Sequence, residues 1–282
     1  MCILALDALE YELVEEFNLE NIKQLEYGKI DISNFKDLAT PVIWASFISG
    51  LPPEEHGLDI KAIPHWRSSV IDKLRQLSIK IGLDRIKGKG RLLELIGFEH
   101  RPFYEEMITD FRISQTETFF DIIPNAKALS VPPYQEWIDP KTQLFLRQAI
   151  DNEEKLGAFE EHVLQIFERK RKKGLKTIKE GDWNLFMTHF MLTDLLGHIY
   201  AGNKTKMFGV YIKAEQLVEE VKELIGDETL LLIVSDHGMK PIGKGTFGEH
   251  SDHGFYSSNF PLSLEKPKMT DFFPLIVKTL TQ

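Results

Sequence analysis

The apolar run over residues 229–234 ends abruptly at Ser235-Asp236-His237-Gly238. An unbroken series of Leu, Ile and Val is typical of a strand that is buried on both faces of a parallel sheet. In such sheets, ligands bind beyond the carboxyl ends of the strands. Because carboxylate oxygens and imidazole nitrogens are common ligands of zinc and similar ions, Asp236 and His237 form a candidate metal site. Taken alone, the Asp-His-Gly sequence is equally compatible with a turn.

Other segments show the same strand character, with helical patterns between them. The further strand-like runs cover residues 2–6, 126–131 and 185–190. Apolar residues recur at helical spacing over 210–224 and over 149–173, where we expect the second helix to end at Gly174. This alternation predicts an α/β fold with a mostly parallel central sheet flanked by helices.

Residues 61–115 fit that alternation poorly, because they are rich in Lys and Arg and contain several glycines. We expect them to form a small inserted cap. Their positive charge could face an anionic substrate, although a solvated helix face is the more usual reason for such a run.

The composition indicates a soluble globular protein with small partners. Hydrophobic residues make up 43% of the chain and charged residues 27%, and the net charge of -9 disfavours binding to nucleic-acid polymers. The single cysteine, Cys2, and the absence of a basic leader favour a cytoplasmic location. No apolar stretch approaches the roughly 20 residues of a membrane-spanning helix, so we expect no membrane association.

Acidic residues also follow two other predicted strands. Asp7 comes directly after the run at 2–6, and Asp194 and His198 follow the run at 185–190. Because four residues separate Asp194 from His198, a helical turn would place both side chains on one face. The carboxylates could instead cap helices, and His198 could be a surface residue. Their repetition at strand ends favours a shared metal site.

A candidate nucleophile begins the segment Thr-Pro-Val-Ile-Trp-Ala-Ser-Phe-Ile-Ser-Gly at residues 40–50. Thr40 is expected at the N-cap and Pro41 at the first position of a short helix that ends at Gly50. The positive end of the helix dipole suits a phosphate or sulfate group. A bound metal would lower the pKa of the Thr40 hydroxyl and make it nucleophilic. The alternative is an ordinary capping threonine.

Together these segments resemble the type I phosphodiesterase/nucleotide pyrophosphatase family of the alkaline phosphatase superfamily. The resemblance rests on Asp7 and on residues 40–57, 194–198 and 235–239, and residues 118–133 are also similar. Four motifs in the right order are far more specific than any one of them. The resemblance implies an alkaline-phosphatase-like fold and a single catalytic domain over residues 1–282.

The resemblance also implies two divalent metal ions, most often zinc, with manganese as an alternative. One ion would have the ligands Asp7, Thr40, Asp236 and His237. The other would have the ligands Asp194, His198 and one further histidine, either His250 or His253. The Gly-x-His-x-x-x-Gly spacing of residues 248–254 favours His250.

The activity implied by the resemblance is hydrolysis of phosphodiester or pyrophosphate bonds in small molecules, with nucleotides as candidate substrates. Thr40 would attack phosphorus and form a phospho- or nucleotidyl-threonine that water then hydrolyses. Tyr134 and Trp137 lie in a loop beyond a strand and are candidates for stacking on a base. His56 is expected to have a structural role, and the remaining histidines are expected to be structural or surface residues: His65, His100, His162 and His189.

Two departures from the family keep other functions open. The asparagine that nucleotide pyrophosphatases carry shortly after the nucleophile is missing, and only a short segment separates His237 from the last candidate ligand. A phosphonate hydrolase, a phosphomonoesterase and a metal-dependent phosphoglycerate mutase therefore remain alternatives. A sulfatase is disfavoured because residue 40 is threonine. From another class of protein, the alternative is a non-catalytic phosphate-ligand binding protein.

Overall fold

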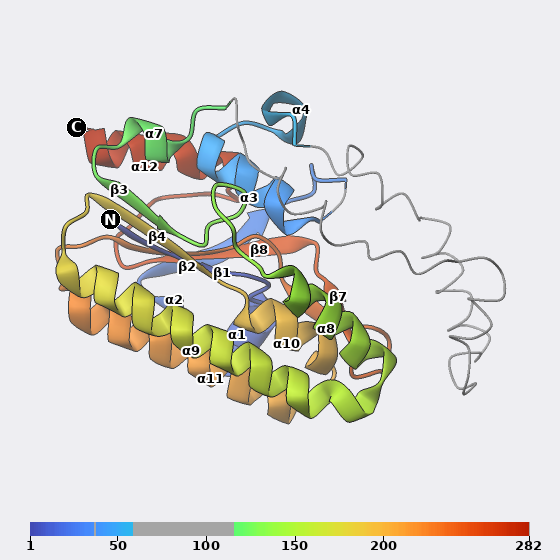
Figure 1. Cartoon of the computed structure of the whole chain (residues 1–282). Coiled ribbons are helices and arrows are strands. Elements are labelled where there is room, and N and C mark those ends of the chain that lie inside the picture. Colours follow the sequence, from blue (N-terminus) through green and yellow to red (C-terminus); the bar gives the residue numbers. More distant parts are fainter. Residues whose placement is uncertain (37, 59–115, 282) are drawn as a thin grey trace.

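The computed structural model describes residues 1–36, 38–58 and 116–281. A six-stranded sheet in the order β2-β8-β5-β1-β4-β3 forms the centre of this part of the chain (Figure 1). Its strands are β1 (Cys2–Leu6), β2 (Glu26–Asp31), β3 (Ala126–Leu129), β4 (Leu185–Phe190), β5 (Leu231–Ser235) and β8 (His253–Ser258). The short strands β6 (Met239–Pro241) and β7 (Gly248–His250) form a separate antiparallel ribbon.

The sheet is mostly parallel. β1 lies at its centre and pairs in parallel with β4 and β5, and β3 pairs in parallel with β4. Only β8 runs antiparallel to its neighbours, β5 and β2. The carboxyl ends of β5, β1 and β4 therefore meet at one edge of the sheet.

Helices cover both faces of the sheet (Figure 1). One face carries α1 (Tyr11–Glu16), α2 (Glu20–Lys23), α8 (Pro140–Asp151), α9 (Leu156–Glu180), α10 (Leu192–Tyr200) and α11 (Lys204–Ile225). The other face carries α3 (Thr40–Ser49), α7 (Phe119–Ile122) and α12 (Phe272–Thr281), and α4 (Pro53–His56) follows α3. Two short 3₁₀ turns, Glu153–Lys155 and Met269–Asp271, precede α9 and α12.

The central strand shows why the sheet needs both layers. Along β1, side chains alternate between the faces, as successive residues of a strand must. Cys2, Leu4 and Leu6 pack in the core beneath α9 and α11, whereas Ile3 and Ala5 pack in the core beneath α3 and α12. All five residues are buried, which explains the unbroken apolar sequence.

The predicted α/β architecture is confirmed, including the bounds of β1 and β4. The expected cap at residues 61–115 lies outside the described residues. The expected helix over 149–173 is wrong, because α8 ends at Asp151 and α9 continues through Gly174 to Glu180. Gly174 does not end the helix, and a Cβ at this position would lie 3.9 Å from atoms of Leu129, Thr188 and Phe190.

Within the described part of the chain, no helix is both long and apolar enough to cross a membrane.

Candidate metal centre and nucleophile

The carboxyl ends of the three central strands bring acidic and imidazole side chains together. Asp7 follows β1, and its backbone N–H donates to the carbonyl of Phe190 at the end of β4, at 2.9 Å. Asp236 and His237 follow β5. Asp7, Asp236 and His237 are all fully buried, so the folded chain places two carboxylates and an imidazole out of contact with bulk water.

Helix α10 supplies the next pair. Asp194 lies in its first turn and His198 in its last, and Asp194 Oδ1 is 3.3 Å from His198 Nε2. The same Asp194 oxygen is 3.5 Å from His250 Nε2, at the end of β7. The ring of His250 also stacks on that of His237, with 3.7 Å between centroids.

The imidazoles of His198, His237 and His250 all direct their Nε2 atoms toward the carboxylates. The Nδ1 atoms of His198, His237 and His250 lie 3.4, 3.1 and 2.8 Å from the backbone carbonyl oxygens of Gly248, Gly238 and Leu38. A carbonyl oxygen only accepts, so each Nδ1 carries the hydrogen. In the neutral imidazoles, the Nε2 lone pairs then face the carboxylates, which is the tautomer that a metal ligand requires.

Several carboxylate oxygens of the cluster lack partners. Asp7 Oδ1, Asp194 Oδ1 and both oxygens of Asp236 are buried and accept no hydrogen bond within the described structure. Lone pairs of oxygen and nitrogen at these distances repel one another unless a cation or a proton lies between them. The donor set of carboxylates and imidazoles therefore fits divalent cations.

The burial and close approach of these side chains also shift the pKa values of the acids. Burial, together with the charges of Asp236 and Asp194, raises the pKa of Asp7 well above its usual value. Burial also raises the pKa of Asp236 to about 7. Burial alone would raise the pKa of Asp194, but the imidazoles of His198 and His250 outweigh it and hold that pKa well below its usual range.

Two overlapping groups of side chains could each hold a metal ion. One consists of Asp194, His198 and His250, and the other of Asp7, Asp194 and His237. Within each group, the ligand atoms lie within 4.8 Å of one another. Asp236 adds a carboxylate oxygen 3.3 Å from His237 Nε2.

Thr40 lies beside these groups, at the start of α3. Its hydroxyl oxygen is 3.4 Å from His237 Nε2 and is buried. The expected N-cap position is wrong, because Ala39 is the N-cap and no side chain caps this helix end. The hydroxyl is therefore not used for capping. The expected end of the helix is confirmed, with Gly50 in the left-handed conformation at φ 72°.

His253 lies in a different place from His250. Its Nε2 is 2.8 Å from Glu10 Oε1 and 3.1 Å from Glu12 Oε2, in a third group of possible ligands. Burial would lower the pKa of His253, but the hydrogen bond that its ring donates to the Glu10 carboxylate outweighs burial and raises that pKa. Of the two candidates for the last ligand, the fold brings His250 to the cluster.

Glu10 and His189 are buried groups near the site that the motifs did not identify. Glu10 accepts a hydrogen bond from Ser251 and contacts His253. His189, expected to be a structural or surface residue without a partner, has its Nε2 2.8 Å from Asp7 Oδ2. The available signal for His189 was an imidazole near the end of a fully buried, mostly apolar strand. His56 has the expected structural role, since its Nε2 lies 3.1 Å from Ser46 Oγ.

The two aromatic candidates for substrate binding both pack against other protein side chains. Tyr134 stacks on Phe120 with 4.5 Å between ring centroids. Trp137 stands edge-on to His189 at 6.0 Å. Their contact with a substrate stays a prediction.

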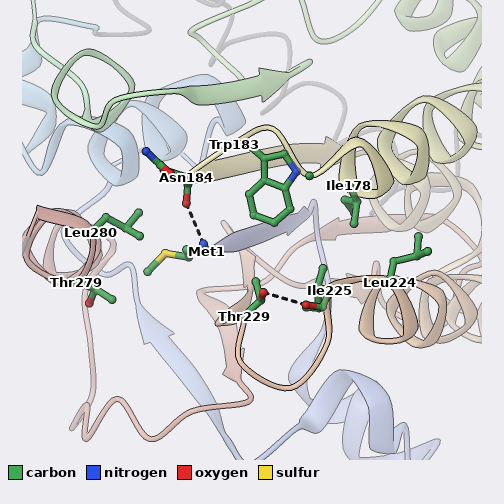
Figure 2. A pocket seen from close by; sticks show the side chains of 10 residues that line it. Met1, Ile178, Trp183, Asn184, Leu224, Ile225, Thr229, Thr279 and Leu280 are labelled. Atoms are coloured by element: carbon green, nitrogen blue, oxygen red, sulfur yellow. Dashed lines mark hydrogen bonds between the residues drawn. The ribbon is translucent and has the colours of Figure 1, made fainter.

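A separate hollow of about 530 Å³ opens at the amino-terminal side of β1, away from the cluster (Figure 2). Figure 2 shows Met1 beside Trp183 and Thr229. The Met1 amino group donates to the carbonyl oxygen of Asn184, at 2.9 Å. Its described lining contains no acid, histidine or cysteine side chain.

The sequence profile of the type I phosphodiesterase / nucleotide pyrophosphatase family matches residues 100–255. The chain belongs to this family, which confirms the prediction from the motifs. The family consists of enzymes of phosphoester chemistry.

Other similarities are partial or distant. The catalytic subunit of human GPI ethanolamine phosphate transferase 3 (Homo sapiens) is 28% identical over 35% of this chain, and the Saccharomyces cerevisiae transferase is 31% identical over 23%. The matches span only 8% and 6% of those proteins. Among solved structures, PH0037 from Pyrococcus horikoshii has a TM-score of 0.47 at 13% identity, over 99% of this chain and 96% of that one. Murine ectonucleotide pyrophosphatase/phosphodiesterase 5 has a TM-score of 0.45 at 13% identity, over 86% and 58%.

Proposed function

We propose that this protein is a metal-dependent hydrolase of small phosphodiesters or pyrophosphates in which Thr40 is the nucleophile. The observation that carries the proposal is the buried Thr40 hydroxyl, which is 3.4 Å from His237 Nε2 and is not used as a helix cap. Pure phosphate binding would not need a hydroxyl at that point of a metal-ligand cluster.

The charge of the cluster supports a role for cations. Three buried carboxylates would repel an anionic phosphate ester, so a substrate can approach only when positive charge compensates them. We propose two divalent ions, zinc or manganese, with Asp7, Asp236 and His237 holding one and Asp194, His198 and His250 holding the other. Bound ions would lower the pKa of the Thr40 hydroxyl and neutralise charge on the phosphoryl oxygens.

The reaction then consists of two in-line displacements at phosphorus. Thr40 Oγ1 forms a bond to phosphorus while the bond to the departing alcohol or phosphate breaks, and the leaving group takes up a proton as the hydroxyl gives one up. Water next displaces Thr40 and restores its hydroxyl. Because each step inverts phosphorus, the configuration is retained overall.

The test compares two aryl esters. The purified protein, loaded with zinc or manganese, should hydrolyse bis-(p-nitrophenyl) phosphate faster than p-nitrophenyl phosphate. Thr40→Ala should lower that rate by about a thousandfold or more, because the covalent step is lost. Thr279→Ala, an exposed threonine of α12, serves as the matched control and should keep wild-type activity. Activity that survives both chelation and Thr40→Ala would refute the mechanism, and a preference for the monoester would favour a phosphomonoesterase.

The last metal ligand can be tested by metal content. His250→Ala should lower the zinc bound per chain, because the Nε2 atom of His250 faces Asp194 in the cluster. His253→Ala removes the partner of Glu10 and Glu12 instead and should leave zinc content unchanged. The opposite pattern would assign the ligand to His253.

A second candidate function is transfer of the phosphoryl group to an alcohol. The sequence similarity to two GPI ethanolamine phosphate transferases favours it, although the matched segments are short parts of those proteins. The first displacement would be the same, and an alcohol would replace water in the second. Adding ethanolamine or glycerol to the diesterase assay should then divert product from the hydrolysed ester to a new ester. A product distribution that does not change with alcohol would exclude transfer to these acceptors.

A further inference from the structure

The histidine at the end of β4 lies outside the groups that could hold a metal, yet it contacts one of their members. His189 is fully buried, and its Nε2 is 2.8 Å from Asp7 Oδ2. A cation bound beside Asp7 keeps this carboxylate ionised, and an ionised carboxylate only accepts hydrogen bonds, so Nε2 then carries the hydrogen and donates it. Strand register explains the contact, since His189 pairs with Ala5 and Asp7 lies just beyond β1.

This hydrogen bond distinguishes the two oxygens of Asp7. Oδ2 is occupied by His189, whereas Oδ1 is buried without a partner in the described structure and lies 3.5 Å from His237 Nε2. The Thr193 hydroxyl donates to the backbone carbonyl oxygen of Asp7. The backbone and side chain of Asp7 are therefore both held, with one oxygen directed at His237.

Two tryptophans fix the ring that makes the contact. Trp44 stands edge-on to His189 with 5.6 Å between centroids and an interplanar angle of 79°. Trp137 does so at 6.0 Å and 78°. Trp44 lies one helical turn after Thr40 in α3, so the helix that carries the nucleophile also supports the imidazole that orients Asp7. Aromatic groups packed in this way restrict the rotation of the ring.

We infer that His189 is a positioning residue that directs Asp7 Oδ1 toward the cation held with His237. The inference rests on the proposed function, in that divalent cations occupy the cluster. Partners of this kind fix the orientation of a metal ligand, and their loss typically lowers metal affinity by about 10- to 100-fold. Asp7, the residue that His189 holds, is not a member of the group formed by Asp194, His198 and His250, so that group should keep its affinity.

The test uses variants that differ in their ability to donate. His189→Gln can place an amide N–H near the position of Nε2, whereas His189→Leu fills a similar volume without a donor. Zinc titration of the metal-free protein by calorimetry should show that His189→Leu weakens one of the two sites by about 10- to 100-fold, and that His189→Gln restores most of the affinity. Thermal unfolding of the metal-free variants reports their folding separately. His162→Leu, which removes a half-buried histidine bonded to Thr142, is the control and should bind zinc as the wild type does.

The outcomes separate this inference from the proposed function. Two sites of wild-type affinity in folded His189→Leu would overturn the inference alone, and so would equal weakening in the Leu and Gln variants. A wild-type protein that binds no zinc would overturn both proposals. If His189→Leu does not fold, His189→Asn replaces it, since its shorter amide cannot reach Asp7 and should bind as weakly. Wild-type affinity in His189→Asn would then contradict the inference.

Discussion

Replacing Asp236 with Asn should stabilise the metal-free protein and at the same time remove much of its response to metal. Asp236 is fully buried, and neither of its carboxylate oxygens has a hydrogen-bond partner among the described residues. The carboxylates of Asp7 and Asp194 lie in the same cluster and carry the same charge when ionised. The native side chain is therefore costly unless a cation compensates it.

The size of the effect follows from that burial. A buried polar group without a partner costs about 1–3 kcal/mol, and more when it is charged. Asn removes the charge and adds N–H donors that neighbouring carboxylates can accept. We expect the metal-free D236N protein to be about 1–3 kcal/mol more stable than the wild type. For a domain near this size, each kcal/mol raises Tm by about 2–4 °C.

With metal bound, the wild type should become the more stable of the two proteins. An ion present at about 100 times its Kd stabilises the folded state by about 2.7 kcal/mol, provided that it does not bind the unfolded chain. D236N lacks one charged ligand, so its Tm should rise much less when zinc is added. Thermal unfolding at pH 8, with chelator and then with excess zinc, measures both effects. Asp227→Asn is the control, because Asp227 is exposed at the other end of β5.

Two results would refute this reasoning. A metal-free D236N protein that is less stable than the wild type would mean that Asp236 is stabilising without an ion. An unchanged rise in Tm with zinc would mean that Asp236 does not take part in metal binding.

Three further substitutions test the packing around the site. Gly254→Ala should destabilise the protein by about 1–3 kcal/mol in chemical denaturation, because its Cβ would lie 2.5 Å from the carbonyl oxygen of Ser235; wild-type stability would contradict the strand pairing. Gly174→Ala should raise the free energy of unfolding by about 0.5–1 kcal/mol, because a Cβ at this helical position meets atoms no closer than 3.9 Å. A lower free energy of unfolding would show that α9 packs more tightly than this distance allows. Tyr211→Phe should cost about 1–3 kcal/mol, because the buried N–H of Glu10 donates to its hydroxyl at 2.8 Å; an unchanged denaturation midpoint would show that this N–H finds another acceptor.

Strands with uniform burial were the part of the fold that the sequence predicted best. β1 and β4 are buried along their whole length, so their apolar runs coincide with their bounds. β2 is mostly half-exposed and mixes charged with apolar residues, and it was not predicted. β8 was also missed, because its second residue is Gly254 and glycine has low strand propensity. Pairing with β5 and β2, which the local sequence does not reveal, is what makes β8 a strand.

The site was predicted from motifs, but the contacts that support it were not. Asp194 and His198 are four residues apart in one helix, so their proximity follows from helical geometry alone. His189 and Asp7 are separated by 182 positions, and their contact depends on the pairing of β1 with β4. The capping position of Thr40 was wrong by one residue, because α3 begins at Thr40 itself with Ala39 as the N-cap, and local preferences fix a helix end only to within a residue or two.

The local fold explains why two histidines only three residues apart lie in different surroundings. His250 ends β7 and pairs with Met239 of β6, directly after the turn that carries His237. This ribbon returns the chain to the carboxyl end of β5, so His250 stacks on His237. The chain then reverses into β8, where His253 pairs with Asp31 and its side chain meets the carboxylates of α1 and its N-cap. Gly254 allows β8 to approach Ser235 closely enough for that reversal. A side chain at residue 254 would push β8 away from β5 and move the ribbon with it, so the position of the last proposed metal ligand depends on a glycine that holds no ion.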